Sequence, residues 1–239
     1  MDIGKAFTFP FDDQEWVKKL IIGAVLLIIP VVNFIAIGYM IRVMRNVAEG
    51  DTRPLPEWDQ WGDDFMKGLL VALAGLAYAL PILLVNGISA IFGIIASSAN
   101  SDGVQSVMAL CSTALSCLSG LWGLLIAVVI PAAILKYAQE GEFSSFFKFA
   151  EIFQWIRDHA KDYIIAVLVI IVARILSGFG VIACGIGVLF TMFWATLTMG
   201  HILGQLWAAT NPPPAAAAAT SYGDYTPPSP TISDEGEEV

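Results

Sequence analysis

The sequence has few charged residues for a chain of 239 residues. Asp, Glu, Lys and Arg make up 14% of it, whereas a soluble domain carries about 25%. Apolar residues take their place, at 57% of the chain and a mean hydropathy of +0.73. Too few polar side chains remain to cover the surface of a water-soluble fold of this size. The composition therefore excludes a soluble globular protein and predicts an integral membrane protein.

Basic residues are the scarcer of the two charge types, with 12 Lys and Arg against 21 Asp and Glu and a formal net charge of -9. No basic face is available for nucleic acid, so we expect no nucleic-acid partner. The Pro- and Ala-rich segment 211–239 is acidic and has too little hydrophobicity to fold. We predict that this segment is a disordered cytoplasmic tail.

Cysteine is also rare, and its spacing lacks the features of a metal site. Cys111, Cys117 and Cys184 form no C-x-x-C pair and no cluster with histidine, as a zinc site would require. We interpret all three as small buried hydrophobes. Motifs for hydrolysis, phosphate binding and dinucleotide binding are absent from the sequence as well. We therefore expect no enzyme activity, no cofactor and no metal.

Long apolar runs, in contrast, are abundant. A hydrocarbon core about 30 Å thick requires roughly 20 apolar residues in a helix. Five such spans are predicted, at about residues 20–41, 67–95, 104–135, 161–183 and 185–207. The predicted fold class is therefore all-α, a polytopic transmembrane helical bundle that occupies residues 1–210.

The second and third spans are longer than a bilayer needs, so we expect them to tilt, kink or extend beyond the lipid. Proline removes one helix hydrogen bond and crowds the preceding turn. Kinks are expected at Pro30, Pro81 and Pro131.

The orientation of the spans is predicted from Lys and Arg, because short loops that are rich in these residues stay on the cytoplasmic side. The loops after the first and third spans carry basic residues, and the other two loops carry none. Five spans then place both basic loops and the tail in the cytoplasm and the N-terminus outside the plasma membrane. The N-terminal lysines fit this arrangement poorly, because it places them outside although basic residues favour the cytoplasmic side. In an alternative, residues 20–41 form a re-entrant hairpin bent at Pro30 and Asn33, and all basic segments share one side.

The chain also contains an internal repeat, in which a helix, a basic loop with a surface segment and a second helix occur twice. The first unit leaves the membrane at Glu49-Gly50-Asp51 and the second at Glu140-Gly141-Glu142. Leu55-Pro56-Glu57-Trp58 is interpreted as a helix start, with proline in the first turn. We expect the amphipathic aromatic surface segments to anchor the loops among the lipid headgroups, and lipid sensing or partner docking is the alternative. The expected interfacial anchors are Trp16, Trp58, Trp61, Phe65, Phe146, Phe153 and Trp155.

One run of motifs resembles a known family. It comprises Gly38-Tyr39-Met40-Ile41-Arg42, Glu49-Gly50-Asp51, Leu55-Pro56-Glu57-Trp58, Phe65 and Lys67-Gly68-Leu69. This run is similar to that of the prokaryotic domain-of-unknown-function 4013 (DUF4013) membrane proteins, over about residues 16–210. The resemblance implies a polytopic membrane protein of bacteria or archaea, and it supplies no reaction, substrate or catalytic residue.

Arg174 is the most unusual residue within the predicted spans. An arginine at mid-bilayer costs at least about 2.5 to 3.5 kcal/mol on insertion scales, and no acid lies within any span beyond Asp162 at the start of the fourth. One hypothesis is an anion or lipid-headgroup site, helped by Asn33 or Asn86 and by the carbonyls that the prolines free. The other is that the fourth span ends near Ser177 and Arg174 extends to the outer headgroups.

His201 lies deep in the last apolar run, between Gly200 and Gly204. These two glycines form a G-x-x-x-G pair that permits close helix approach. A lone histidine is interpreted as a packing residue rather than a proton relay.

The absence of a catalytic constellation favours a non-enzymatic membrane scaffold, assembly or envelope-homeostasis component. Its partners would be the lipid bilayer and a membrane or cytoplasmic protein. The alternative is a small transporter or channel whose path lies between the two repeat units.

Overall fold

The computed structural model describes residues 1–99, 101–182 and 186–211, and these residues form helices and no strand. Four of the helices are long and apolar enough to cross a membrane, namely Trp61–Ser98, Asp102–Glu140, Ala160–Ile182 and Gly187–Thr210. The predicted all-α class is confirmed. In chain order the elements are α1 (Ile3–Thr8), η1 (Phe9–Asp12), α2 (Trp16–Ile28), α3 (Phe34–Glu49), α4 (Trp61–Ser98), α5 (Asp102–Glu140), η2 (Phe143–Phe147), α6 (Phe149–Asp158), α7 (Ala160–Gly178), η3 (Phe179–Ile182) and α8 (Ile186–Thr210).

The first predicted span, residues 20–41, is two helices rather than one. α2 and α3 lie on either side of Pro30, and Val31 adopts a left-handed conformation with φ of 73°. The chain breaks here because proline disfavours the helical conformation of the residue before it and cannot donate a helix hydrogen bond. With 13 and 16 residues, α2 and α3 reach only about 20 and 24 Å. The prediction of a single span was wrong, and the break lies where the re-entrant alternative placed its bend.

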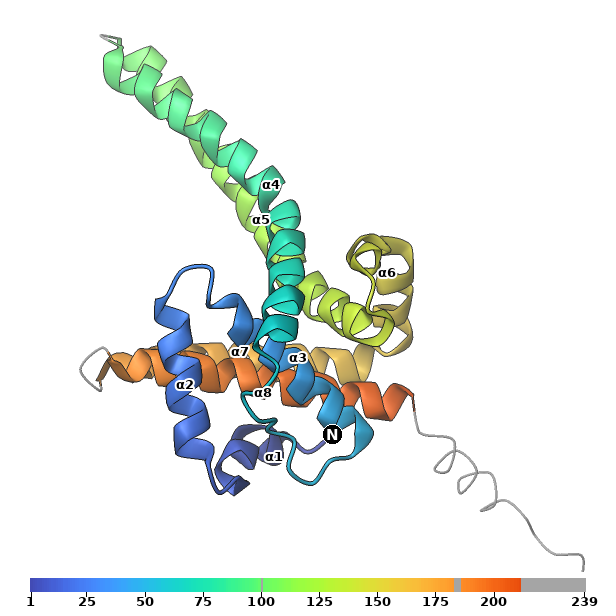
Figure 1. Ribbon diagram of the computed structural model, residues 1–239. Coiled ribbons are helices and arrows are strands. Elements are labelled where there is room, and N and C mark those ends of the chain that lie inside the picture. Colours follow the sequence, from blue (N-terminus) through green and yellow to red (C-terminus); the bar gives the residue numbers. More distant parts are fainter. Residues whose placement is uncertain (100, 183–185, 212–239) are drawn as a thin grey trace, which may run out of the picture.

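The N-terminal segment packs against the last helix. The backbone N–H of Asp2 donates to Gln205 Oε1 at 2.6 Å, and Gln205 Nε2 donates to the Asp2 carbonyl at 2.9 Å. The indole N–H of Trp194 donates to the Phe7 carbonyl at 3.0 Å. The N-terminus therefore lies toward the C-terminal end of α8 (Figure 1). The re-entrant alternative, in which all basic segments share one side of the membrane, accounts for this contact.

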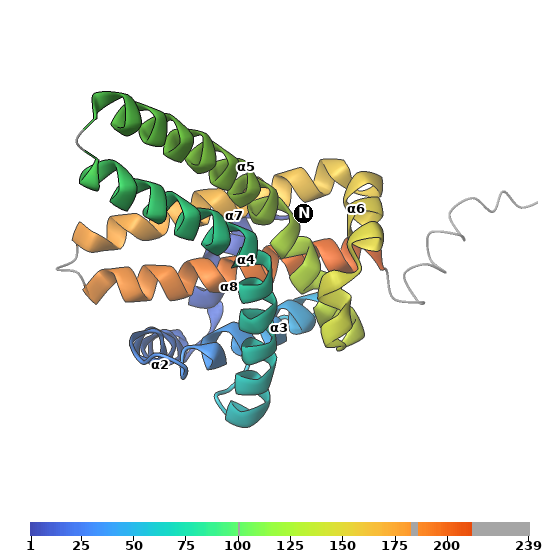
Figure 2. The same ribbon diagram turned by 90° about the horizontal axis from the view of Figure 1, so that it is seen from above.

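α4 and α5 form an antiparallel hairpin that projects from the rest of the molecule (Figure 1). With 38 and 39 residues, each helix is about 57 to 59 Å long, nearly twice the thickness of a hydrocarbon core. Both spans are thus overlong, as predicted. Pro81 and Pro131 lie inside the two helices, which continue through them. α4 changes direction between its two ends (Figure 2), as a missing helix hydrogen bond permits.

Glycines let α3 cross α4 at very short distance. A Cβ atom added to Gly68 would lie 1.8 Å from the carbonyl oxygen of Phe34, and one added to Gly38 would lie 1.9 Å from that of Asp64. No other residue type fits at these two positions without displacing the backbone of the neighbouring helix. Small residues have this role at helix interfaces in membranes.

α8 packs against the same helix α3 in a similar manner. A Cβ atom on Gly200 would lie 2.8 Å from the carbonyl oxygen of Met40, and one on Gly204 would lie 2.5 Å from that of Met44. The G-x-x-x-G pair thus serves close helix approach. α3 is held between α4 and α8, so it forms the centre of the body.

The two repeat units end their first helices alike but differ in their surface segments. Gly50 and Gly141, with φ of 86° and 76°, are left-handed C-caps of α3 and α5. In the second unit the segment folds as η2 and α6, whereas residues 51–60 of the first unit are not helical. The interpretation of residues 55–58 as a helix start was therefore wrong, because α4 begins at Trp61.

Two of the cysteines are not buried. Cys111 is half-buried and Cys117 is exposed, and both are free thiols in α5. The prediction failed because the part of the hairpin that carries them projects from the body. Cys184 and the tail from residue 212 onward lie outside the described residues.

Candidate functional site

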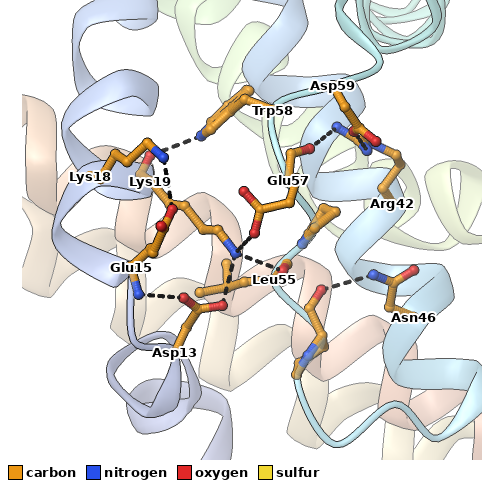
Figure 3. A network of polar contacts seen from close by, with 12 residues as sticks. Asp13, Glu15, Lys18, Lys19, Arg42, Asn46, Leu55, Glu57, Trp58 and Asp59 are labelled. Carbon is orange, nitrogen blue, oxygen red and sulfur yellow. Dashed lines mark hydrogen bonds and ion pairs between the residues drawn. The ribbon is translucent and has the colours of Figure 1, made fainter.

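A polar clasp fastens the α3–α4 loop to α2 and α3 (Figure 3). We use this name for the network of charged side chains formed by Asp13, Lys19, Arg42, Glu57, Asp59 and Asp64. The network joins five segments of the chain: the residues before α2, α2 itself, α3, the loop that leads into α4, and α4, which contributes Asp64.

Arg42 is the central cation of the clasp. Its Nε and Nη2 atoms donate to the two oxygens of Asp64 at 2.8 and 2.6 Å, and its Nη1 donates to Asp59 Oδ1 at 2.8 Å. Nη2 also donates to the Glu57 carbonyl at 2.9 Å. The Arg42 side chain is 9% exposed and that of Asp64 is fully buried. This bidentate geometry is the strong form of an arginine–carboxylate pair.

Lys19 is the second cation, and it comes from α2. Its ammonium group lies 2.9 Å from Asp13 Oδ2 and 2.7 Å from Glu57 Oε1, and it donates to the Leu55 carbonyl at 3.2 Å. All three of its N–H bonds thus have an acceptor. Lys19 is buried, whereas Lys18, the other lysine of α2, is exposed and pairs with Glu15.

The clasp shifts the pKa values of its members. Burial lowers the pKa of Lys19, but hydrogen bonds to Glu57 and Asp13 outweigh it, and the pKa is raised above its ordinary value. Burial likewise raises the pKa of Asp13, but the hydrogen bond and charge of Lys19 leave it below its ordinary value. The hydrogen bond from Arg42 lowers the pKa of Asp59. Asp13, Lys19 and Asp59 are therefore held in their charged forms. Asp64 differs, because burial raises its pKa above the ordinary value although the hydrogen bond and charge of Arg42 lower it.

Aromatic and backbone contacts complete the clasp. Trp58 stacks on Tyr39 with ring centroids 4.0 Å apart, and its indole N–H donates to the Lys19 carbonyl at 3.3 Å. The Tyr39 hydroxyl donates to the Pro56 carbonyl at 2.7 Å. Asn46 Nδ2 donates to the Pro54 carbonyl at 3.1 Å. Side chains of α2 and α3 bind the carbonyls of residues 54–57, which explains why no helix starts there.

A second feature is an apolar groove where the α4–α5 hairpin leaves the body. We call it the Arg174 groove; its volume is about 390 Å³, and α2, α3, α4, α5, α7 and α8 all contribute to its wall. Ten of its twelve lining residues are apolar, and Thr196 and Arg174 are the others. The volume is typical of small-ligand pockets, which span about 300 to 1,000 Å³.

Arg174 differs from the other arginines of the bundle in its surroundings. Within the part of the chain that the structure describes, its guanidinium forms no hydrogen bond and no ion pair. Arg45, by contrast, donates from Nε and Nη2 to the Ala138 carbonyl at 3.2 and 3.0 Å. Pro131 lines the same groove, so one predicted kink and Arg174 are brought together.

The other candidate residues do not join this groove. Asn86 receives a long hydrogen bond from Ser119 at 3.4 Å within the hairpin. Asn33 lies at the break before α3, and its buried Oδ1 atom has no hydrogen-bond partner among the described residues. The predicted cluster of intramembrane polar groups is therefore not formed.

His201 is a packing residue in the structure. Its ring stacks on Phe9 at a centroid distance of 4.3 Å, and its Nδ1 atom lies 3.0 Å from Gln205 Nε2. It is buried where the N-terminal segment meets α8. This contact agrees with the interpretation of a lone histidine.

The predicted interfacial anchors divide into two groups. Phe146 is buried and stacks on Tyr137 at 4.7 Å, so its assignment as a surface anchor was wrong; the chain folds η2 back onto α5. Trp58 is held in the clasp. The remaining anchors are exposed or half-buried at the protein surface: Trp16, Trp61, Phe65, Phe153 and Trp155.

These features define a polytopic, helical membrane protein in which charged side chains hold α2 and α3 to the loop between α3 and α4. The family model described as "Protein of unknown function (DUF4013)" matches residues 21–186. The chain therefore belongs to this family, as the motifs predicted. Neither the curated proteins nor the solved structures contain a match to it.

The motifs of the family resemblance are mainly clasp residues and their neighbours. Gly38 and Gly68 set the α3–α4 crossing, Tyr39 and Arg42 bind the loop, and Gly50 ends α3. This network is not apparent from the sequence, because Arg42 and Asp64 are 22 residues apart. A signal was present, since Arg42 follows an apolar run that must be buried and so requires an acid nearby.

Proposed function

We propose that this protein is a non-enzymatic scaffold of a prokaryotic plasma membrane, and that it recruits another integral membrane protein. The recruiting surface is the outer hairpin, by which we mean residues 82–98 of α4 and 102–128 of α5. The observation that carries the proposal is the exposure of this hairpin outside the body of the protein. The clasp has a supporting role, because it fixes the base from which the hairpin projects.

Exposure distinguishes the outer hairpin from its base. Near the base, Ala74, Tyr78, Ala133 and Tyr137 are buried against the body. Large apolar side chains of the outer hairpin are instead exposed along both helices: Leu83, Leu84, Ile88, Ile91, Ile94, Ile95, Val104, Val107, Leu110, Leu118, Leu121, Leu124, Leu125 and Val128. In a bilayer these surfaces meet lipid or the helices of another protein.

Open glycines favour another protein over lipid alone. Nothing lies within 4 Å of a Cβ atom built on Gly87, Gly93, Gly120 or Gly123. Glycine lowers helix propensity by about 1 kcal/mol relative to alanine, and contact with acyl chains does not require it. Small residues instead permit a second transmembrane helix to approach closely. Gly120 and Gly123 are three residues apart and share one face of α5.

Site-specific photo-crosslinking in native membranes tests the proposal. A benzophenone amino acid at position 124, which is on the same face as Gly120, should yield one adduct with a different membrane protein. Gly123→Leu should abolish this adduct, because the larger side chain blocks close approach. The same probe at Ile175, an exposed position of α7, should give no such adduct. An adduct of twice the chain mass, or lipid adducts alone, would refute recruitment.

The placement of the chain in the membrane forms part of the proposal. Four spanning helices put both ends of residues 1–210 on one side, together with the basic segments after α3 and α5. Because Lys and Arg are retained in the cytoplasm, we infer that the clasp, α6 and the N-terminal segment face the cytoplasm. The four-helix count and the N-terminal contacts with Gln205 support this inference.

A second candidate function is a small transporter. The observation that favours it is the Arg174 groove, which lies between helices of the two repeat units. Solute flux into liposomes, compared between the wild type and Arg174→Leu, distinguishes this candidate from the scaffold. The absence of solute-dependent flux from the wild type would exclude the transporter.

A further inference from the structure

The Arg174 groove combines one cation with an apolar wall at the depth of the bilayer. Arg174 is 14 residues beyond Ala160, the first residue of α7, which places it about 21 Å along the helix. A hydrocarbon core is about 30 Å thick. The groove is therefore within reach of molecules that move laterally in the membrane, and lipids are the most abundant of these.

The charge of the groove favours an anionic occupant. The described residues provide neither an ion pair nor a hydrogen bond to the Arg174 guanidinium, and its neighbours in the groove are apolar apart from Thr196. The Thr196 hydroxyl is already engaged with the Met192 carbonyl at 3.0 Å. A guanidinium in such surroundings is stabilised by an anion that accepts two parallel hydrogen bonds, as a phosphate diester oxygen pair does.

The remaining wall suits the rest of a lipid molecule. Met40, Met192 and Met199 line the groove, and their unbranched side chains adapt to a flexible acyl chain. Pro131 and Ala127 lie on the wall beside them. Because Pro131 has no N–H, it cannot donate to the Ala127 carbonyl, which is thus free to accept a headgroup hydroxyl.

We propose that the Arg174 groove binds an anionic glycerophospholipid, with the phosphate on the Arg174 guanidinium and an acyl chain along the apolar wall. Phosphatidylglycerol fits this site because its headgroup carries hydroxyl donors as well as the phosphate. The site does not depend on the proposed scaffold function, since the groove lies at the base of the hairpin and shares only Ala127 with the outer hairpin.

Native mass spectrometry of the full chain in detergent tests the site. The protein is mixed with phosphatidylglycerol or with phosphatidylcholine of the same acyl chains, and the bound lipid is counted. We expect the wild type to retain phosphatidylglycerol about tenfold more strongly, because the choline ammonium of phosphatidylcholine neutralises its phosphate and weakens the charge-assisted interaction with Arg174. Arg174→Gln should abolish this preference. Arg157→Gln is the matched control, because Arg157 is an exposed arginine of α6 outside the groove, and it should leave the preference unchanged.

A second variant tests the groove without removing the charge. Ala127 is exposed on the groove wall, so Ala127→Trp should fill the groove while the core stays intact. It should reduce retention of the lipid although Arg174 is present. Equal retention of both lipids by the wild type, or unchanged preference in Arg174→Gln, would overturn the proposal. Unchanged preference in a folded Ala127→Trp protein would do so as well.

Discussion

Replacement of Arg42 by methionine should destabilise the protein strongly. Arg42→Met removes both hydrogen bonds to Asp64, at 2.8 and 2.6 Å, and leaves a fully buried carboxylate without its cation. Loss of one partner of a buried ion pair costs about 3 to 5 kcal/mol. The thioether fills much of the vacated space, so the electrostatic loss dominates. The bond to the Glu57 carbonyl is lost too, which releases the loop before α4.

Asp59→Asn is the matched control in the same network. Asp59 lies 2.8 Å from Arg42, but its side chain is 61% exposed, and an exposed ion pair contributes little. We expect a much smaller change than for Arg42→Met, although both substitutions remove a charge from the same guanidinium network.

The assay is unfolding by SDS in mixed micelles, followed by tryptophan fluorescence. Trp58 reports directly on the clasp because it stacks on Tyr39. The free energy of unfolding should fall by about 3 to 5 kcal/mol in Arg42→Met. If it stays within about 0.5 kcal/mol of the wild type, as for an ordinary surface substitution, the clasp does not hold the fold together and the reasoning fails.

Two further predictions concern helix packing and pH. Gly68→Ala should lower the free energy of unfolding by about 1 to 3 kcal/mol or prevent folding, because its Cβ atom would lie 1.8 Å from the Phe34 carbonyl oxygen. Gly75→Ala on the same helix has open space around it and should be neutral or stabilising; equal effects of the two would contradict the close crossing. The Asp13–Lys19 pair should stabilise the fold between about pH 4 and pH 10. The pKa of Asp13 is lowered and that of Lys19 is raised. The stability that the pair contributes is therefore lost below about pH 4, as Asp13 becomes protonated, and above about pH 10, as Lys19 loses its proton. Unfolding measured from pH 3 to pH 11 should show a weaker dependence in Lys19→Met, and an identical profile would exclude the pair.

The membrane-spanning helices were predictable because their signal is local. A run of apolar residues of sufficient length has few alternatives to a membrane helix, and α4, α5, α7 and α8 lie close to the predicted spans. The glycine caps at Gly50 and Gly141 follow from equally local chemistry.

Hydropathy alone does not predict that the first span is divided into two helices. Residues 20–41 are long enough to cross a bilayer, and hydropathy does not weigh Pro30 against the apolar residues around it. The N-terminal segment is held against α8 by the contacts of Asp2 with Gln205, which are 203 residues apart. No local pattern indicates a contact over that separation, so orientation was the weakest part of the prediction.

The candidate site was predicted only in part. Arg174 was identified by its cost in lipid, and the structure places it in a groove with Pro131. Asn33, Asn86 and His201 were grouped with it because all are polar residues in apolar runs, but composition does not determine which helix faces meet. The clasp was missed for the same reason, since its cations pair with acids of other segments, namely Asp13 before α2, Glu57 and Asp59 in the loop, and Asp64 in α4.

Cysteine accessibility in intact cells tests the central claim most directly, namely that apolar helices cross a bilayer with every basic segment on its cytoplasmic side. Single cysteines are placed at Lys5, Arg53, Lys148 and Ser101 in a chain from which the three natural cysteines have been removed. A membrane-impermeant thiol reagent should label only Ser101→Cys from outside, and the other three only after permeabilisation. Labelling of Arg53→Cys or Lys148→Cys in intact cells would contradict the orientation, and recovery of the chain in the detergent-free supernatant would contradict the bilayer itself.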